Sequence, residues 1–179
     1  DDFRVKLQND PPADVTPWKV FLKEGAVPVR CANRVFTEPK RQFLSKMMQE
    51  LEAAGMVSNN PVSRFASSAH PVAKPGNPDE FRFAVDMKRV NDLLESTAYP
   101  LPNLNNILQH VDKAKFFATF DLFKGFWQLP LDEACQEFFS VMTPDGVYTP
   151  SRVIQGSESG TNACQSAMAQ VFGDVVYRA

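Results

Sequence analysis

The sequence predicts an α+β fold built from antiparallel strands and about three helices. Short runs with strand-like alternation, such as 81–86, recur between turns rich in proline and glycine. Longer segments at 37–54, 104–111 and 161–176 place apolar residues at helical spacing. No internal repeat or low-complexity tract is present, so strands interleaved with helices indicate a mixed domain.

The first elements are predicted to be an extended arm and a helix. Residues 1–36 carry prolines at positions 11, 12, 17 and 28 around short alternating runs, which favours extended, edge-like structure. Thr37 can cap a helix, Pro39 is tolerated in its first turn, and Gly55 is a good stop signal. The apolar face of this helix is formed by Phe43, Met47, Leu51 and Ala54.

A hairpin that carries cations is predicted next. The turn KPGNPD at 74–79 contains the proline and glycine that supply fixed and left-handed dihedrals. A short extended run, 69–73, precedes the turn, and the alternating run 81–86 follows it. The two runs together indicate a two-stranded flap.

The second half of the chain is predicted to add two helices and two strands. Residues 104–111 fit an amphipathic helix. Residues 115–121 are expected to form a buried strand because of their phenylalanines, and 148–154 is a further strand candidate. The segment 161–176 is expected to be the last helix.

Composition narrows the class of protein. The 179 residues are 44% apolar, which suits one compact unit or two small subdomains. With 19 basic and 21 acidic residues the net charge is −2, so any contact with nucleic acid must be local. The three cysteines are far apart, which indicates neither a disulfide framework nor a zinc knuckle. No membrane-length apolar run or signal peptide is evident, so we expect an intracellular protein, cytoplasmic or nuclear, with no membrane partner.

The most informative segment is FFATFDLFKGFWQLPLD, residues 116–132. Its apolar run delivers one carboxylate, Asp121, to the end of the expected strand, and Lys-Gly-Phe-Trp-Gln follows at once. Carboxylate oxygen is a ligand that magnesium prefers, so Asp121 is a candidate metal ligand beside a pocket for a flat substrate. Taken alone, such an aspartate more often merely ends a strand.

Four segments, in this order, resemble reverse transcriptases, in particular those of gypsy-type long-terminal-repeat retrotransposons. FRFAVDMKRVN at 81–91 resembles a strand of their fingers, and YPLPNLNNIL at 99–108 resembles the link into their palm. FATFDLFKGFWQLPL at 117–131 contains the family's first catalytic aspartate. Gln155-Gly156, followed by Gln165-Ser166-Ala167-Met168, resembles a loop and helix of the family.

The resemblance implies a right-hand polymerase fold with fingers and part of a palm. It assigns 1–36 to an extended arm and the start of the fingers, 37–98 to the fingers, and 99–179 to a partial palm that is truncated before the second catalytic motif. The implied activity is RNA-directed DNA polymerisation on an RNA or DNA template, with a primer and dNTP as the other partners.

The resemblance also assigns roles to individual residues. Asp121 would be catalytic and would ligate two Mg²⁺ ions, and the backbone carbonyl of Leu122 would assist at the second ion beside the nucleotide. Two metals about 3.5 to 4 Å apart activate the primer 3′-hydroxyl and hold the triphosphate in this type of chemistry.

Five further residues are implied to bind the incoming nucleotide. Lys74 and Arg82 would clamp its triphosphate. Phe126 would lie beneath the sugar and exclude a 2′-hydroxyl by steric overlap. Gln155 would touch the sugar, and Gly156 would allow close approach of the backbone. Taken alone, these residues are typical of surface cations, a core aromatic and an ordinary turn.

The departures from the family pattern bear on activity. The second catalytic motif, Tyr-x-Asp-Asp, does not occur, and the only adjacent aspartates are Asp1 and Asp2. With one carboxylate the second metal lacks an adequate ligand set, so we expect weak or absent Mg²⁺ binding and no polymerisation by this chain alone. Ile154 and Cys164 also differ from the residues usual at their positions.

Two alternatives remain open from the sequence. A truncated domain retained as a protein-interaction module would expose a palm edge along 116–121, which allows a homo-oligomer or a protein partner. A nucleic-acid binder without catalysis would show salt-dependent affinity, although the near-neutral charge argues against tight binding.

Overall fold

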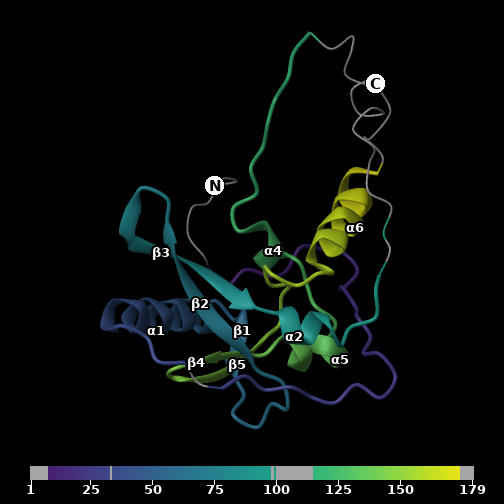
Figure 1. Cartoon of the computed structure of the whole chain (residues 1–179). Coiled ribbons are helices and arrows are strands. Elements are labelled where there is room, and N and C mark those ends of the chain that lie inside the picture. Colours follow the sequence, from purple (N-terminus) through teal and green to yellow (C-terminus); the bar gives the residue numbers. More distant parts are fainter. Residues whose placement is uncertain (1–7, 33, 98, 100–114, 174–179) are drawn as a thin grey trace.

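The computed structural model describes residues 8–32, 34–97, 99 and 115–173 (Figure 1). Five α-helices, one 3₁₀ helix and five strands are present in these ranges, which confirms a mixture of helices and strands. Three of the α-helices have only four residues each. In chain order the elements are α1 (Glu38–Ala53), β1 (Val57–Asn59), β2 (Ser67–Lys74), β3 (Asn77–Asp86), α2 (Lys88–Asn91), α4 (Gly125–Gln128), α5 (Glu133–Gln136), η1 (Glu137–Phe139), β4 (Val141–Thr143), β5 (Gly146–Pro150) and α6 (Gly160–Phe172).

The five strands form one sheet in the order β1-β5-β4-β2-β3. Three neighbouring pairs are antiparallel, as the sequence predicted. The pair β2 and β4 is parallel, with Ser67 opposite Val141 and Ser68 opposite Met142, so the prediction of antiparallel strands was wrong for this pair. The sheet therefore combines strands from two distant parts of the chain, 57–86 and 141–150.

The hairpin predicted at 69–86 is formed by β2 and β3. Its pairing runs from Ser68 opposite Asp86 to Ala73 opposite Phe81, and then shifts at a bulge before Lys74. Gly76 in the turn has φ of +79°, the left-handed conformation that its glycine suits. The hairpin extends along α1 in Figure 1.

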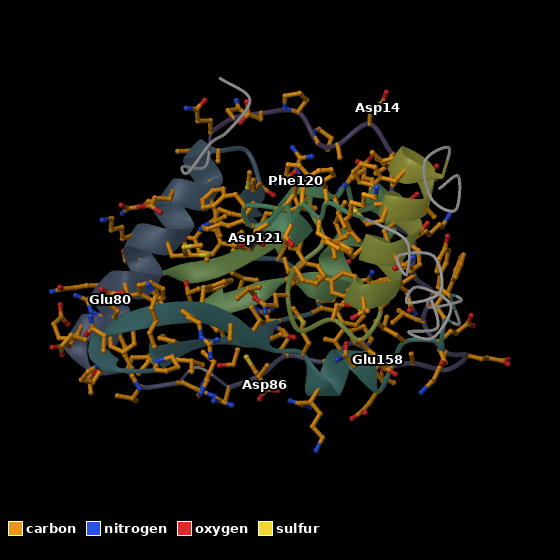
Figure 2. All side chains as sticks on the ribbon, turned by 90° about the horizontal axis from the view of Figure 1, so that it is seen from above. Asp14, Glu80, Asp86, Phe120, Asp121 and Glu158 are labelled. Atoms are coloured by element: carbon orange, nitrogen blue, oxygen red, sulfur yellow. The ribbon has the colours of Figure 1, made fainter. Side chains whose placement is uncertain are left out.

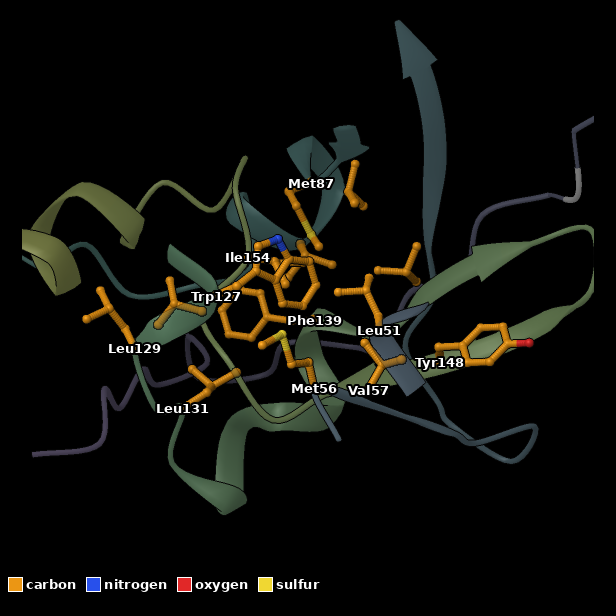
Figure 3. Close-up of a cluster of buried hydrophobic side chains, with 14 of the residues drawn as sticks. Leu51, Met56, Val57, Met87, Trp127, Leu129, Leu131, Phe139, Tyr148 and Ile154 are labelled. Carbon is orange, nitrogen blue, oxygen red and sulfur yellow. The ribbon is translucent and has the colours of Figure 1, made fainter. Parts of the chain in front are cut away.

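The core lies where α1, the sheet and the segment after α4 meet. The predicted helix is present as α1, and it buries Leu44, Met47, Met48 and Leu51. Figure 3 shows Leu51 in one cluster with Met87, Trp127, Phe139 and Ile154, all of them buried. Phe43 lies at the margin of this core, with its ring centroid 5.7 Å from that of Phe81.

The described part of the N-terminal arm is extended, as its prolines indicated. It contains no long strand and instead makes isolated bridges to three separate segments. The bridged pairs are Trp18 with Leu131, Leu22 with Leu94 and Arg30 with Ala66.

The buried strand predicted at 115–121 is not observed. These residues pair with no described strand, and Figure 1 shows the segment standing away from the sheet as it descends to α4. Phe116 is 93% exposed and Phe120 is 78% exposed. The prediction was wrong because an apolar run is buried only where another surface covers it, and no described element covers this one.

The other predicted elements of the second half have mixed outcomes. β5 overlaps only the first part of the strand expected at 148–154, because the ladder ends at Pro150. The final helix is present as α6, although residues 174–176 of the expected range lie outside the described residues. The helix expected at 104–111 also lies outside them. Within the described ranges, no helix combines the length and apolar character needed to cross a membrane.

Candidate functional site

Asp121 lies on the exposed segment that leads into α4. The carbonyl of Leu122 accepts a hydrogen bond of 3.2 Å from the backbone N–H of Gly125, which closes a turn. Lys124 caps α4 in the left-handed conformation, with φ of +47°. Figure 2 shows Asp121 and Phe120 between α1 and α6 in the view from above. The Asp121 carboxylate is therefore accessible to a solvent ion, and the Leu122 carbonyl keeps a second lone pair.

Helix α4, which carries Phe126, lies between two other elements. Trp127, the next residue, is buried, and its ring centroid lies 6.5 Å from that of Phe83 on β3. Phe126 is half-buried, and a Cβ at Gly160 of α6 would lie 3.4 Å from its ring. One helical turn is thus held by the sheet on one side and by the start of α6 on the other.

The turn at Gln155 and Gly156 lies against the end of β3. Gly156 has φ of +104°, and a Cβ there would approach the carbonyl oxygen of Val85 to 2.9 Å. Glycine is therefore required both for the backbone conformation and for the contact. Gln155 is exposed beside this contact.

Asn91 is a site residue that the sequence did not single out. Its Nδ2 donates a hydrogen bond of 3.1 Å to the carbonyl of Gly156, and its Oδ1 accepts one of 3.2 Å from the N–H of Glu158. Asparagine offers a donor and an acceptor on one rigid group, but no local spacing indicates a partner so distant in sequence. The structure alone reveals this connection.

The two predicted phosphate-binding cations have different surroundings. Lys74 Nζ lies 2.7 Å from Oε2 of Glu80 within the flap, and its hydrogen bond holds the pKa of Glu80 below its ordinary value. Arg82 lies opposite Val72 in the ladder, and its exposed side chain makes no hydrogen bond or ion pair among the described residues. Because successive strand residues face opposite sides, Arg82 projects from the face of the hairpin opposite to Phe83 and Trp127.

An ion pair and a histidine lie on the same face of the hairpin as Arg82. Arg34 approaches Asp86 with an Nη2 to Oδ2 distance of 3.3 Å, and its Nη1 lies 3.4 Å from Nδ1 of His70. His70 pairs with Ala84 across the hairpin, so these side chains share the face of Arg82. The face is thus polar and partly cationic.

The predicted residues come together only in part. Gly156 contacts the end of β3 and is linked to Asn91, while Phe126 contacts the start of α6. Lys74 lies at the tip of the flap and is paired there with Glu80. Within the described ranges, no group of three or more metal-ligating side chains forms a metal site, so Asp121 has no such cluster around it.

The part of the chain that matches a known protein family includes all of these residues. The family profile described as "Reverse transcriptase (RNA-dependent DNA polymerase)" matches residues 72–178, more than half of the chain. Each residue assigned a catalytic or nucleotide-binding role from the sequence lies inside that range.

Individual relatives agree with the profile. The chain is 30% identical over 118 residues to the retrovirus-related Pol polyprotein from transposon 412 of Drosophila melanogaster, covering 64% of this chain and 10% of that protein. It is 32% identical over 101 residues to the corresponding polyprotein from transposon gypsy of the same organism, covering 56% and 10%. It is 24% identical over 180 residues to the enzymatic polyprotein of Cauliflower mosaic virus (strain NY8153), covering 96% and 26%. The chain thus spans about a tenth of the two transposon relatives.

Proposed function

Because the chain belongs to the reverse transcriptase (RNA-dependent DNA polymerase) family, we propose that it supplies the fingers and part of the palm of a gypsy-type RNA-directed DNA polymerase. The observation that carries the proposal is the family match over 72–178, which includes Asp121 and its flanking sequence. The reaction is template-directed addition of a dNTP to a primer on an RNA or DNA template.

Asp121 and Leu122 are the residues that would hold magnesium. An exposed carboxylate followed by a carbonyl fits an ion that takes oxygen ligands and fills its remaining positions with water and phosphate oxygens. When bound, the metal ions would activate the primer hydroxyl and hold the triphosphate. One carboxylate does not complete a two-metal site, so these 179 residues by themselves would bind Mg²⁺ weakly or not at all and would not extend a primer.

The remaining residues would bind and select the nucleotide. Arg82 has an uncommitted guanidinium among the described residues, and Lys74 would exchange Glu80 for a phosphate. Phe126, which lies against the start of α6, would exclude a 2′-hydroxyl. The exposed Gln155 would contact the sugar, and Gly156 would allow the backbone to approach it.

The proposed division of the chain follows the family resemblance. Residues 1–36 would be the arm and the start of the fingers, 37–98 the fingers, and 99–179 part of the palm. Strands β4 and β5 lie between β1 and β2 in the sheet, so they would complete the fingers sheet from within the third range.

Primer extension tests the proposal directly. The 179 residues joined to a family segment that bears Tyr-x-Asp-Asp should extend a DNA primer on an RNA template with Mg²⁺. Asp121→Asn should reduce the rate by about a thousandfold or more, because the carboxylate holds the metals. Asp145→Asn, an aspartate in the turn between β4 and β5, is the matched control and should leave the rate unchanged. The absence of extension, or equal rates for the two variants, would contradict the proposal.

A second function is favoured by the exposed phenylalanines before α4. Phe116, Phe117 and Phe120 form an uncovered apolar run, which is a feature of protein-interaction surfaces. We therefore retain, as the alternative function, a role in protein interaction through this exposed run.

A further inference from the structure

Residues 122–125, the entry turn, lead into α4 and are bound to that helix by hydrogen bonds. The backbone N–H of Gly125 donates to the carbonyl of Leu122 at 3.2 Å. The side chain of Gln128, at the end of the helix, reaches back so that its Nε2 donates to the carbonyl of Phe123 at 2.7 Å. Two successive carbonyls of the entry turn are therefore held by α4, one through its backbone and one through a side chain.

The backbone of the entry turn has an unfavourable conformation at one residue. Lys124 has φ of +47° and ψ of 45°, and no other non-glycine residue in the described part of the chain has a positive φ. This left-handed conformation costs free energy for any residue with a side chain. The Lys124 side chain makes no capping hydrogen bond to α4. Other contacts must therefore hold the turn, and the hydrogen bond from Gln128 is one of them.

The hydrogen bond from Gln128 acts directly on this strained residue. The Phe123 carbonyl belongs to the planar peptide unit that joins Phe123 to Lys124, and the orientation of that unit sets φ of Lys124. Because Gln128 holds the carbonyl, it also holds the left-handed conformation. That conformation brings the N–H of Gly125 back to the carbonyl of Leu122.

Gln128 is itself fixed by contacts at the far end of α4. Its backbone carbonyl accepts a hydrogen bond of 2.9 Å from the N–H of Ala13 in the N-terminal arm. The carbonyl of Leu129, the next residue, accepts one of 3.0 Å from the N–H of Val153, and Leu129 is buried. The backbone of Gln128 is thus anchored in the fold, while its side chain holds the entry turn.

We propose that Gln128 is a positioning residue for Asp121 and Leu122, which rests on the proposed function because these two residues would hold magnesium there. The entry turn fixes the Leu122 carbonyl, and Asp121 directly precedes that residue. Groups that orient metal ligands change metal affinity without touching the ion. Gln128 acts in this way, through its hydrogen bond to the entry turn.

Helix α5 provides a matched control within the same chain. Nε2 of Gln136 donates to the carbonyl of Leu131 at 3.0 Å, again five residues earlier. Gln136 and Gln128 each end a helix of four residues. The start of α5 has a further support, because the Asp132 side chain accepts a hydrogen bond from the N–H of Ala134. Gln136 therefore makes the same kind of hydrogen bond in a segment that has no proposed metal ligand.

Hydrogen exchange in the 179-residue chain tests the hold on the entry turn without metal or nucleotide. Gln128→Met keeps the length of the side chain but removes the donor, so exchange of the Gly125 amide should accelerate about fivefold. The Leu129 amide, which donates to the carbonyl of Phe126, should accelerate by about twofold at most, because that end of α4 stays anchored. Gln128→Glu should act as Gln128→Met does, because a carboxylate cannot donate. Gln136→Met should leave the Gly125 amide unchanged.

Magnesium dependence tests the positioning role in the protein joined to a Tyr-x-Asp-Asp segment. Gln128→Met should raise the Mg²⁺ concentration that gives half the maximal rate of primer extension by about tenfold. At saturating Mg²⁺ the rate should return toward the wild-type value. A loss of folded protein would lower the maximal rate but leave the half-saturating concentration unchanged. Gln136→Met should show the wild-type dependence on Mg²⁺.

Three results would overturn the positioning role of Gln128. One is unchanged exchange of the Gly125 amide in Gln128→Met, and a second is equal acceleration at Gly125 and Leu129, which would mean that α4 frays as a whole. The third is a half-saturating Mg²⁺ concentration that Gln128→Met leaves unchanged while Asp121→Asn still abolishes extension. That third result would contradict the positioning role alone, whereas a joined wild-type protein that extends no primer would contradict the proposed function.

Discussion

Asn91 holds Gly156 against the end of β3 through a carboxamide that is used at both ends. Its Nδ2 donates to the carbonyl of Gly156, and its Oδ1 accepts from the N–H of Glu158. The glycine itself abuts the carbonyl of Val85. Because Gln155 immediately precedes this anchored residue, the position of its backbone depends on α2 and β3, which lie far from it in sequence.

Removal of the Asn91 carboxamide should loosen the 155–158 turn. Asn91→Ala should lower the free energy of unfolding by about 1 to 2 kcal/mol, because two hydrogen bonds are lost. Hydrogen exchange of the Glu158 amide should accelerate, since that amide loses its acceptor. Asn60→Ala removes a hydrogen bond to Thr149 of β5 and is the control for general destabilisation. Equal acceleration at Glu158 in both variants would contradict a local role for Asn91.

Gly156→Ala should destabilise the fold more than a comparable glycine substitution elsewhere. The left-handed backbone costs about 1 to 2 kcal/mol for a residue with a side chain, and the Cβ would also clash with Val85. Gly25→Ala is the matched control, because Gly25 also has a positive φ but has open space at its Cβ position. Urea denaturation of both variants measures the difference. Equal losses would mean that the contact with Val85 contributes nothing.

The ion pair between Arg64 and Glu137 should make stability depend on pH in the acidic range. Arg64 lies 3.0 Å from Glu137, and its side-chain hydrogen bond lowers the pKa of that carboxyl. The folded state therefore binds the proton less readily than the unfolded state. The contribution is fully present above the unfolded pKa of about 4.3 and is lost as the pH falls through the lower folded value.

Arg64→Ala is expected to reduce this pH dependence. The effect should be small, because both side chains are partly exposed to solvent. The free energy of unfolding should therefore fall less between neutral pH and about pH 3 in the variant than in the wild type. Lys40→Ala removes a cation from the first turn of α1 and serves as the control. If the free energy of unfolding depends on pH in the same way in Arg64→Ala as in the wild type, the ion pair does not contribute to that dependence.

Phe126→Val should weaken discrimination against ribonucleotides in the protein joined to the Tyr-x-Asp-Asp segment. A smaller side chain leaves room for a 2′-hydroxyl, so the ratio of kcat/KM for dNTP over rNTP should fall by about a hundredfold. Phe138→Val shortens an aromatic that packs against Phe65 and is the control for altered packing. A ratio that stays constant while both rates fall would assign Phe126 to the core and not to selection.

The sequence by itself determined the elements whose signals are local. The helix α1 follows from its apolar spacing between Thr37 and Gly55, and the β2–β3 hairpin follows from the turn around Gly76. The family was also evident from short ordered motifs, and the match over 72–178 confirms it. The roles of Asp121 and the nucleotide-binding residues remain predictions.

Only the tertiary structure decided which surfaces meet. The parallel pairing of β2 with β4 and the link from Asn91 to Gly156 join residues far apart in sequence. The sequence around one partner does not indicate which residue the other partner is. The phenylalanines of 115–121 predicted burial but are exposed. The physical reason is that hydrophobicity and periodicity describe what a segment can bury, whereas burial itself depends on a covering surface that the rest of the fold must supply.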